Sequence, residues 1–195
     1  VGGSWRAKEE AFLKDVEWLD NLKVKASYGT QGNDNVGYYH NYSDLYRVER
    51  VDGQPAFSKE LRGNKNLTWE KSNNFNAGIE LGLWNWLDFN VDFFIKETKD
   101  MLYYSPLPPS QGSPSGIYRN EMDMKNTGIE FELNANIFDR DNFKWNVALN
   151  GTHYKNELTK LPISKPADKY PDGYQSGLYW RKIGGSLYDF YVYEY

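Results

Sequence analysis

The chain contains no cysteine and only two histidines among its 195 residues. The absence of cysteine excludes disulfide bonds and thiolate metal sites. His40 and His153 lie far apart in the sequence, which gives no metal-ligand or catalytic spacing. Lysine and arginine number 23 against 27 aspartates and glutamates, so the net charge is −4. Because the basic residues are also scattered, this balance argues against a nucleic-acid-binding surface.

Long apolar runs are missing as well. The mean hydropathy is −0.79, and no stretch approaches the roughly 20 apolar residues of a transmembrane helix. The strands of a membrane barrel would still pass this test, because apolar and polar residues alternate in them. No secretory signal sequence begins at Val1, and the chain ends inside an aromatic run, Tyr188 to Tyr195. We therefore expect a piece of a larger protein.

Alternation of apolar and polar residues dominates the stretch from Asn64 to Ile95. Odd-numbered residues are apolar on both sides of a short turn at Asn85-Trp86, and we call them the apolar parity. They are Phe75, Ala77, Ile79, Leu81 and Leu83 before the turn, and Leu87, Phe89, Val91, Phe93 and Ile95 after it. The other parity carries mainly amides, carboxylates and glycines. Period two predicts strands, and the turn joins them into a hairpin with one apolar and one polar face.

The length of these strands fits a membrane. Ten residues from Phe75 to Trp84 extend about 34 Å at about 3.4 Å per residue. Tilted by about 45°, they project to about 24 Å, against the roughly 25 Å apolar band of an outer-membrane barrel. Trp84 and Trp86 flank the turn, while Trp69 and Tyr103-Tyr104 lie at the far strand ends. That placement is typical of aromatic girdles, although Trp and Tyr also favour strands in general.

The same pattern recurs along the chain. Leu22 to Gly29 predicts a third strand, and Thr127 to Ile137 with Trp145 to Thr152 predicts a second hairpin around Phe138 to Phe143. Gly-Ile-Glu occurs at Gly78 and again at Gly128. Thr30 to Thr68 and Ser105 to Gly116 are rich in turn residues and predict long loops. Short turns alternating with long loops indicate an all-β, antiparallel up-and-down meander.

The two ends of the chain give weaker patterns. Val1 to Asp20 places Phe12, Leu13, Val16 and Leu19 near helical spacing, which predicts a short amphipathic helix or an ordered turn. Leu161 to Gly173 predicts a loop, and Leu187 to Tyr195 predicts a strand.

We expect the apolar parity to face lipid and the polar parity to face a water-filled lumen. The predicted lumen-facing residues are Asn74, Asn76, Glu80, Asp88, Asn90, Asp92, Lys96, Glu130, Glu132 and Asn134. Carboxylates two residues apart on a strand lie on the same polar face. This spacing does not indicate the acid pair of a glycoside hydrolase, whose two carboxyl groups need a defined separation. The sequence therefore predicts no enzyme and no catalytic, cofactor or metal site.

Four segments resemble the barrel of SusC/RagA-type TonB-dependent outer-membrane transporters of Bacteroidetes. They are LKVKASYGTQGN at 22–33, NLTWEK at 66–71, DMLYY at 100–104 and NTGIE at 126–130. The resemblance implies a transmembrane β-barrel of about 22 strands in the full-length family, located in the bacterial outer membrane. It implies import of oligosaccharides or peptides, with TonB and a SusD-like lipoprotein as partners. We expect residues 1–195 to be part of the barrel domain, without the plug domain and the signal peptide.

Two questions stay open at this point. The tyrosines expected in or beside loops, Tyr38, Tyr39, Tyr103, Tyr104 and Tyr118, suit stacking on a substrate or contact with the lipoprotein, and equally suit girdle or loop packing. The alternative function is a soluble all-β carbohydrate-binding module, in which a second sheet would cover the apolar face. Even spacing of turns would favour that module, whereas long loops alternating with short turns favour the barrel.

Overall fold

A computed structural model describes residues 1–35, 42–108, 110 and 116–192. The chain forms two compact units. Unit 1 comprises Val1–Thr30, Asn73–Lys96 and Asn126–Asn156, and unit 2 comprises Gln31–Ser72, Glu97–Lys125 and Glu157–Tyr195. None of the described residues forms a helix long and apolar enough to cross a membrane.

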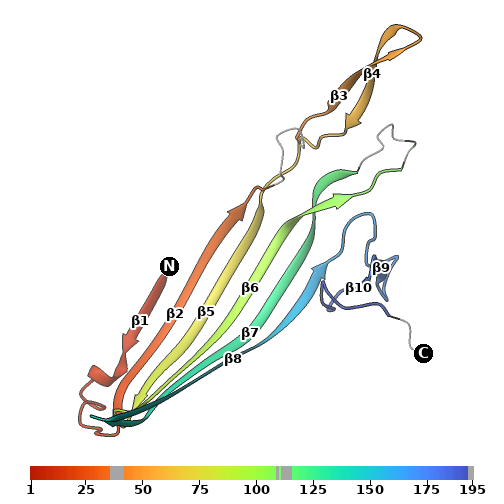
Figure 1. Cartoon of the computed structure of the whole chain (residues 1–195). Helices are drawn as coiled ribbons and strands as arrows, with labels where there is room; N and C mark the ends of the chain where they lie inside the picture. The colour runs from red at the N-terminus through yellow and green to blue at the C-terminus, as the bar shows by residue number, and fades with distance from the viewer. Residues whose placement is uncertain (36–41, 109, 111–115, 193–195) are drawn as a thin grey trace. The chain divides into compact units, whose positions relative to one another are not determined.

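The main element is an antiparallel sheet of six strands in the order β1-β2-β5-β6-β7-β8 (Figure 1). Its strands are β1 (Gly2–Arg6), β2 (Leu19–Asn33), β5 (Glu70–Leu83), β6 (Leu87–Ser105), β7 (Ile117–Arg140) and β8 (Phe143–Lys160). Neighbours in the sheet are neighbours in the chain, apart from the insertion between β2 and β5. This confirms the predicted meander and both predicted hairpins. β1 and β8 are the edge strands, so the sheet is not closed.

Of the two N-terminal alternatives, the structure confirms the ordered turn over residues 11–15 and not the amphipathic helix, and it adds a strand that the sequence did not predict. Residues Gly2–Arg6 form β1, which pairs antiparallel with β2 from Gly2 opposite Ser27 to Arg6 opposite Lys23. A single turn of 3-10 helix, η1 (Ala7–Glu9), follows. Phe12 and Val16, which have helical spacing, lie in a segment of turns instead of a helix, and Phe12 is 70% exposed. Spacing alone does not hold a helix when the apolar residues have nothing to pack against.

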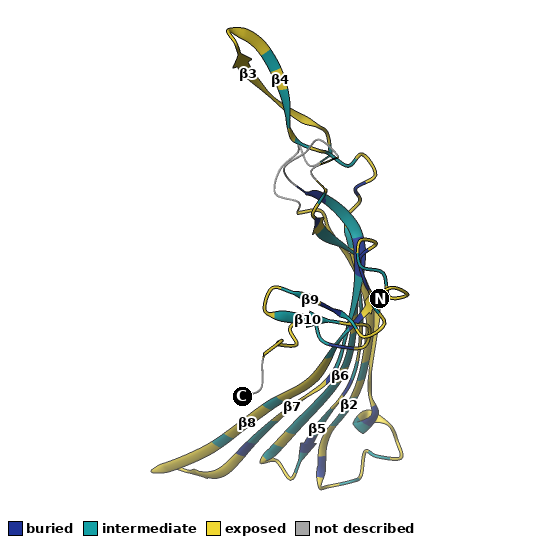
Figure 2. Ribbon diagram, turned by 90° about the vertical axis from the view of Figure 1, so that its right-hand side faces the viewer, coloured by how far each residue is buried: buried dark blue, intermediate teal, exposed yellow. Residues whose placement is uncertain are grey.

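The predicted loop from Thr30 to Thr68 contains a further hairpin that was not predicted from the sequence. β3 (Leu45–Val51) and β4 (Gln54–Leu61) pair antiparallel around Asp52-Gly53. Both turn residues are left-handed, with φ of 52° and 77°, which is the type I′ geometry that Asp-Gly favours in two-residue hairpins. Asp-Gly between two alternating stretches is the sequence signal from which this hairpin could have been predicted. Most of β3 and β4 is exposed (Figure 2).

The turn between β5 and β6 covers residues 84–86 and so includes the predicted Asn85-Trp86. Trp84 and Asn85 have φ of 53° and 57°, and the Trp86 amide donates to the Leu83 carbonyl at 3.3 Å. Trp is uncommon in the left-handed region, but two outside partners hold this turn. The Trp84 amide donates to the Trp18 carbonyl at 3.0 Å, and the Asn85 amide donates to the Asp20 carboxylate. The β7–β8 turn is likewise short, at Asp141-Asn142.

Asp100 interrupts the alternation of β6. Its φ is +56°, and a left-handed residue inside a strand is typical of a bulge. Its amide donates to the Asp123 carboxylate at 2.9 Å, and its carbonyl accepts a bond from the Asn120 side chain at 2.7 Å. The strand facing read from Phe89 to Ile95 therefore does not continue unchanged beyond this residue.

The C-terminal segment folds onto the strands of unit 2. The predicted loop from Leu161 to Gly173 is confirmed, because these residues form turns and contain no strand. The predicted strand from Leu187 to Tyr195 is wrong for Leu187 to Val192, the part that the structure describes. Instead β9 (Tyr174–Ser176) and β10 (Tyr179–Arg181) form a small hairpin. An apolar cluster of Met122, Leu158, Leu161 and Tyr174 lies beneath it, with Met101 and Tyr103 packed against it. This cluster is the buried core of unit 2.

Candidate functional site

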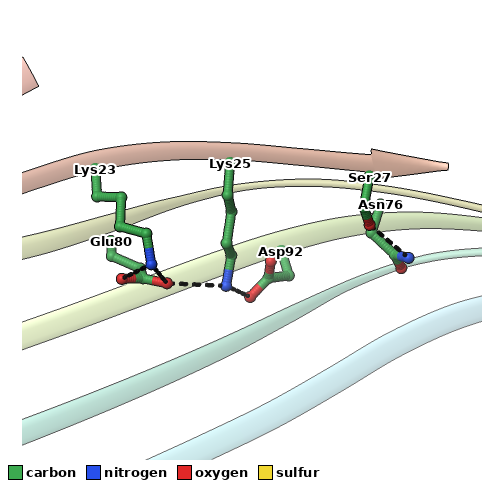
Figure 3. Close-up of polar contacts among 6 residues, drawn as sticks. All are labelled: Lys23, Lys25, Ser27, Asn76, Glu80 and Asp92. Carbon is green, nitrogen blue, oxygen red and sulfur yellow. Dashed lines mark hydrogen bonds and ion pairs between the residues drawn. The ribbon is translucent and has the colours of Figure 1, made fainter. Parts of the chain in front are cut away.

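The polar face of the sheet in unit 1 carries a ladder of ion pairs (Figure 3). Lys23 and Lys25 are two residues apart in β2 and so lie on one face, toward Glu80 on β5. The Lys23 Nζ lies 3.2 Å from Glu80 Oε2, and the Lys25 Nζ lies 3.3 Å from Glu80 Oε1. Lys25 also reaches Asp92 on β6, at 3.0 Å from Oδ2. The ladder thus crosses three strands and neutralises both lysines.

These side chains are only partly desolvated. Between 26% and 33% of each side chain is exposed, so solvent screens each pair to about 1 kcal/mol or less. The ladder therefore contributes little to stability by itself. Its main effect is electrostatic, since it places alternating charges at fixed positions along the polar face.

The repeated Gly-Ile-Glu has a steric reason at its glycine. A Cβ on Gly78 would lie 2.1 Å from Asp92 Oδ1 and 2.8 Å from Lys25 Cε. A Cβ on Gly128 would lie 2.6 Å from Phe94 Cζ and from the Cβ of Tyr154. In both copies the missing side chain lets residues of neighbouring strands cross over the backbone. At Gly78 this permits the Lys25–Asp92 pair.

A hollow of about 310 Å³ lies on this face beside the ladder. Of the predicted lumen-facing residues, the structure brings together here Asn90, Asp92, Glu130 and Glu132. Residues that the predicted set omitted complete the lining, namely Lys25, Phe131, Asn150, Gly151 and Thr152. Lys25, Asn150 and Thr152 share the polar parity of their strands, so the same alternation would have found them. The hollow presents amides, a hydroxyl and carboxylates, which suit polar ligands.

The other predicted lumen-facing residues lie elsewhere. Asn76 contacts Ser27 at 3.5 Å, and Asn134 donates to Glu132 at 2.9 Å. Asp88 lies beside Gly82, whose added Cβ would be 3.4 Å from its Oδ1. Asn74 is half-buried on β5, and Lys96 is exposed on β6. None of these five lines the hollow, and the facing of all ten predicted residues toward a lumen stays a prediction.

The apolar parity is exposed in unit 1. Its large exposed side chains include Phe75 (39%), Ile79 (44%), Phe93 (40%), Ile129 (45%), Phe131 (45%) and Leu149 (57%). The described part of unit 1 contains no second sheet to cover them. A soluble sandwich would bury such residues, whereas lipid covers them in a membrane barrel.

Aromatic rings gather at the short-turn end of unit 1. Trp84 lies between Trp18 and Trp86, with ring centroids 6.4 and 6.2 Å away. At the next turn Phe138 contacts Phe143 and Trp145 at 5.9 and 6.0 Å. The placement agrees with the girdle expected for the membrane interface.

The predicted loop tyrosines are not loop residues where the structure describes them. Tyr103 and Tyr104 lie in β6 and Tyr118 lies in β7. Tyr104 and Tyr118 pack edge to face at 5.2 Å, and the Gly116 amide donates to the Tyr104 hydroxyl. β6 and β7 therefore extend closer to the proline-rich segment between Ser105 and Ile117 than the sequence suggested. Tyr38 and Tyr39 fall outside the described residues.

Comparison with known proteins gives the family. Residues 3–189 match the family model "TonB dependent receptor-like, beta-barrel". The chain belongs to the TonB-dependent receptor β-barrel family, and its relatives are of the SusC/RagA type. TonB-dependent receptors are outer-membrane β-barrel proteins, and they are receptors and transporters rather than enzymes.

The relatives are much longer than this chain. The TonB-dependent receptor SusC of Bacteroides thetaiotaomicron is 31% identical over 205 residues, covering 97% of this chain and 20% of that protein. The TonB-dependent receptor P39 of Formosa agariphila is 32% identical, covering 97% and 18%. The RagAB peptide importer in its closed-closed state matches with a TM-score of 0.83 at 31% identity, covering 94% of this chain and 20% of that one. The chain thus spans about a fifth of these relatives.

Proposed function

We propose that this chain is part of the barrel wall of a TonB-dependent importer of oligosaccharides or peptides that works with a SusD-like lipoprotein. The observation that carries the proposal is the two-sided sheet of unit 1. Apolar side chains such as Ile79 and Leu149 are exposed on one face, and the Lys25–Asp92 pair with its hollow occupies the other. Lipid on one side and an aqueous path on the other explain both faces.

The polar face suits a ligand rich in hydrogen-bonding groups. Asn90, Asn150 and Thr152 offer both donors and acceptors to the hollow. The charges of Lys25 and Asp92 are largely engaged with each other, whereas Glu130 and Glu132 add two carboxylates to the lining, so the hollow favours neutral or cationic groups over anionic ones. Oligosaccharide hydroxyls and peptide amides both meet these requirements. A similar relative is named as a peptide importer.

The exposed β3–β4 hairpin is an argument for a lipoprotein partner. A two-stranded hairpin is marginally stable alone in water, yet Val48 and Phe57 remain 65% and 74% exposed. The hairpin is held at its base by Asp44, which pairs with Lys59 at 2.6 Å and accepts a bond from the Gly63 amide at 3.0 Å. We propose that a protein partner covers its apolar side chains.

Uptake by cells tests the proposal. Cells that lack the full-length receptor should lose uptake of a labelled oligosaccharide or peptide mixture, and the wild-type gene should restore it. A protonophore should stop uptake, because TonB transmits the proton-motive force. The lipoprotein should copurify with the receptor. Uptake that persists in the deletion strain, or that ignores the protonophore, contradicts the proposal.

A matched pair of variants tests this wall specifically. Thr152→Trp would fill the hollow, so we expect slower uptake with normal receptor abundance in the membrane. Leu149→Trp places the same indole ring on the exposed apolar face and should leave uptake unchanged. Equal uptake rates in the two variants would mean that the hollow does not border the transport path.

A further inference from the structure

The C-terminal hairpin of unit 2 is firmly attached to β8. The Leu158 amide donates to the Gly185 carbonyl at 2.8 Å, and the Gly184 amide donates to the Leu158 carbonyl at 2.9 Å. Leu158 is fully buried. Tyr179 in β10 forms a further antiparallel bridge with Phe190. The backbone of this segment is therefore fixed against β8.

The hairpin carries a cross-strand pair with unmet hydrogen-bonding capacity. Tyr174 in β9 is directly opposite Arg181 in β10. Tyr174 is 6% exposed and belongs to the apolar cluster. The Arg181 guanidinium lies over the Tyr103 ring, 6.0 Å from its centroid. Within the described part of the chain, neither the Tyr174 hydroxyl nor the Arg181 Nε has a hydrogen-bond partner, although both atoms are buried.

Such an arrangement is costly unless something binds there. A buried donor without an acceptor costs about 1–3 kcal/mol, and a partly buried guanidinium normally has a carboxylate or phosphate partner. No acidic side chain among the described residues forms an ion pair with Arg181. Burial raises the pKa of Tyr174 most, and the Tyr103 hydroxyl raises it further, while the nearby Arg181 guanidinium opposes the rise without forming a bond of hydrogen-bond geometry, so the Tyr174 hydroxyl remains a protonated donor at neutral pH.

We infer that Tyr174 and Arg181 form a binding site for a carboxylate, with Tyr103 as its aromatic floor. A carboxylate has two oxygens and can accept from Arg181 Nε–H and Tyr174 O–H together. A neutral acceptor would satisfy the hydroxyl but leave the guanidinium charge uncompensated. The carboxylate comes either from an imported ligand or from an aspartate or glutamate elsewhere in the full-length receptor. Only the ligand source rests on the proposed function.

A high-resolution structure of the full-length receptor, with ordered water visible, tests the site directly. We expect a carboxylate within hydrogen-bond distance of both Arg181 and Tyr174. Water alone at this position, both in the ligand-free receptor and with a bound peptide acid, overturns the inference. This result does not depend on transport, so it separates a failure of the site from a failure of the proposed function.

Hydrogen exchange of the β9–β10 amides in the purified receptor tests a protein carboxylate. Arg181→Gln would leave a buried carboxylate unpaired, so exchange should become about tenfold faster. Lys182→Gln removes the same charge from the exposed neighbouring residue and is the matched control. Tyr174→Phe, which keeps the ring, should accelerate exchange to a smaller extent.

Binding of a short peptide, as the free acid and as its C-terminal amide, tests a ligand carboxylate. If the ligand supplies it, the free acid should bind about ten- to hundredfold more tightly than the amide. Arg181→Gln should abolish that preference, while Lys182→Gln should keep it. If Arg181→Gln equals Lys182→Gln in both the exchange and the binding measurements, the site does not bind a carboxylate.

Discussion

Replacing Ile79 by arginine should destabilise the barrel strongly, because it would place a guanidinium near the middle of the bilayer. Ile79 lies four residues before Leu83, the last residue of β5, and the aromatic cluster of Trp84 and Trp86 follows. At about 3.4 Å per residue and a tilt of about 45°, this distance is about 10 Å along the membrane normal. The midplane of a band of about 25 Å lies about 12 Å from its edge.

Arginine at that depth costs about 2–4 kcal/mol, which lowers the folding equilibrium constant about 30- to 700-fold. Asn90→Arg is the matched control, because Asn90 lines the polar hollow beside Glu130 and Glu132. We expect that control to cost under about 1 kcal/mol. Glu80→Arg is a poorer control, since it would place a third cation beside Lys23 and Lys25.

The assay is urea unfolding of the full-length receptor in lipid vesicles, followed by the gel mobility of the folded barrel. The Ile79→Arg variant should unfold at a clearly lower urea concentration than both the wild type and Asn90→Arg. Equal midpoints for the two variants would refute the assignment of faces.

Three further results are expected. Gly78→Ala should displace Asp92 and Lys25 and cost about 1 kcal/mol in the same assay, whereas Gly3→Ala, where no atom lies within 4 Å of the added Cβ, should be neutral; equal effects would show that close approach does not explain the glycine. Gly53→Ala, at φ of 77°, should destabilise the β3–β4 hairpin by about 1 kcal/mol and speed trypsin cleavage at Arg50, and unchanged cleavage would mean that another contact holds the turn. Because outer-membrane barrels have short periplasmic turns and long external loops, an impermeant thiol reagent on intact cells should label Gln54→Cys and spare Asn142→Cys; the reverse pattern would invert the proposed orientation.

Much of the main sheet could be predicted from the sequence, because its signals are local. Side chains alternate along any strand, so the polar parity of β5 and β6 was visible without knowledge of their partners. The turn at residues 84–86 includes the predicted Asn85-Trp86. The same alternation predicted Glu80, Asp92, Glu130 and Glu132 as one set, and the structure places all four on the polar face with the ladder or the hollow.

Other features depended on partners far away in the sequence. Gly2–Arg6 is a strand because β2 lies beside it, and nothing in those five residues specifies that pairing. The left-handed Asp100 is stabilised by Asp123 and Asn120, which an alternating pattern cannot show.

The sequence by itself determined the class of fold, the faces of the strands and the family, because each depends on a periodic pattern or a short motif. Tertiary structure alone decided which residues meet. It joined Lys25 to Asp92 across 67 positions and placed Arg181 over Tyr103. The physical reason is that alternation specifies only the side of a strand on which a residue lies. Register and strand order specify its neighbours, and these are set by the summed packing and hydrogen bonding of the whole sheet.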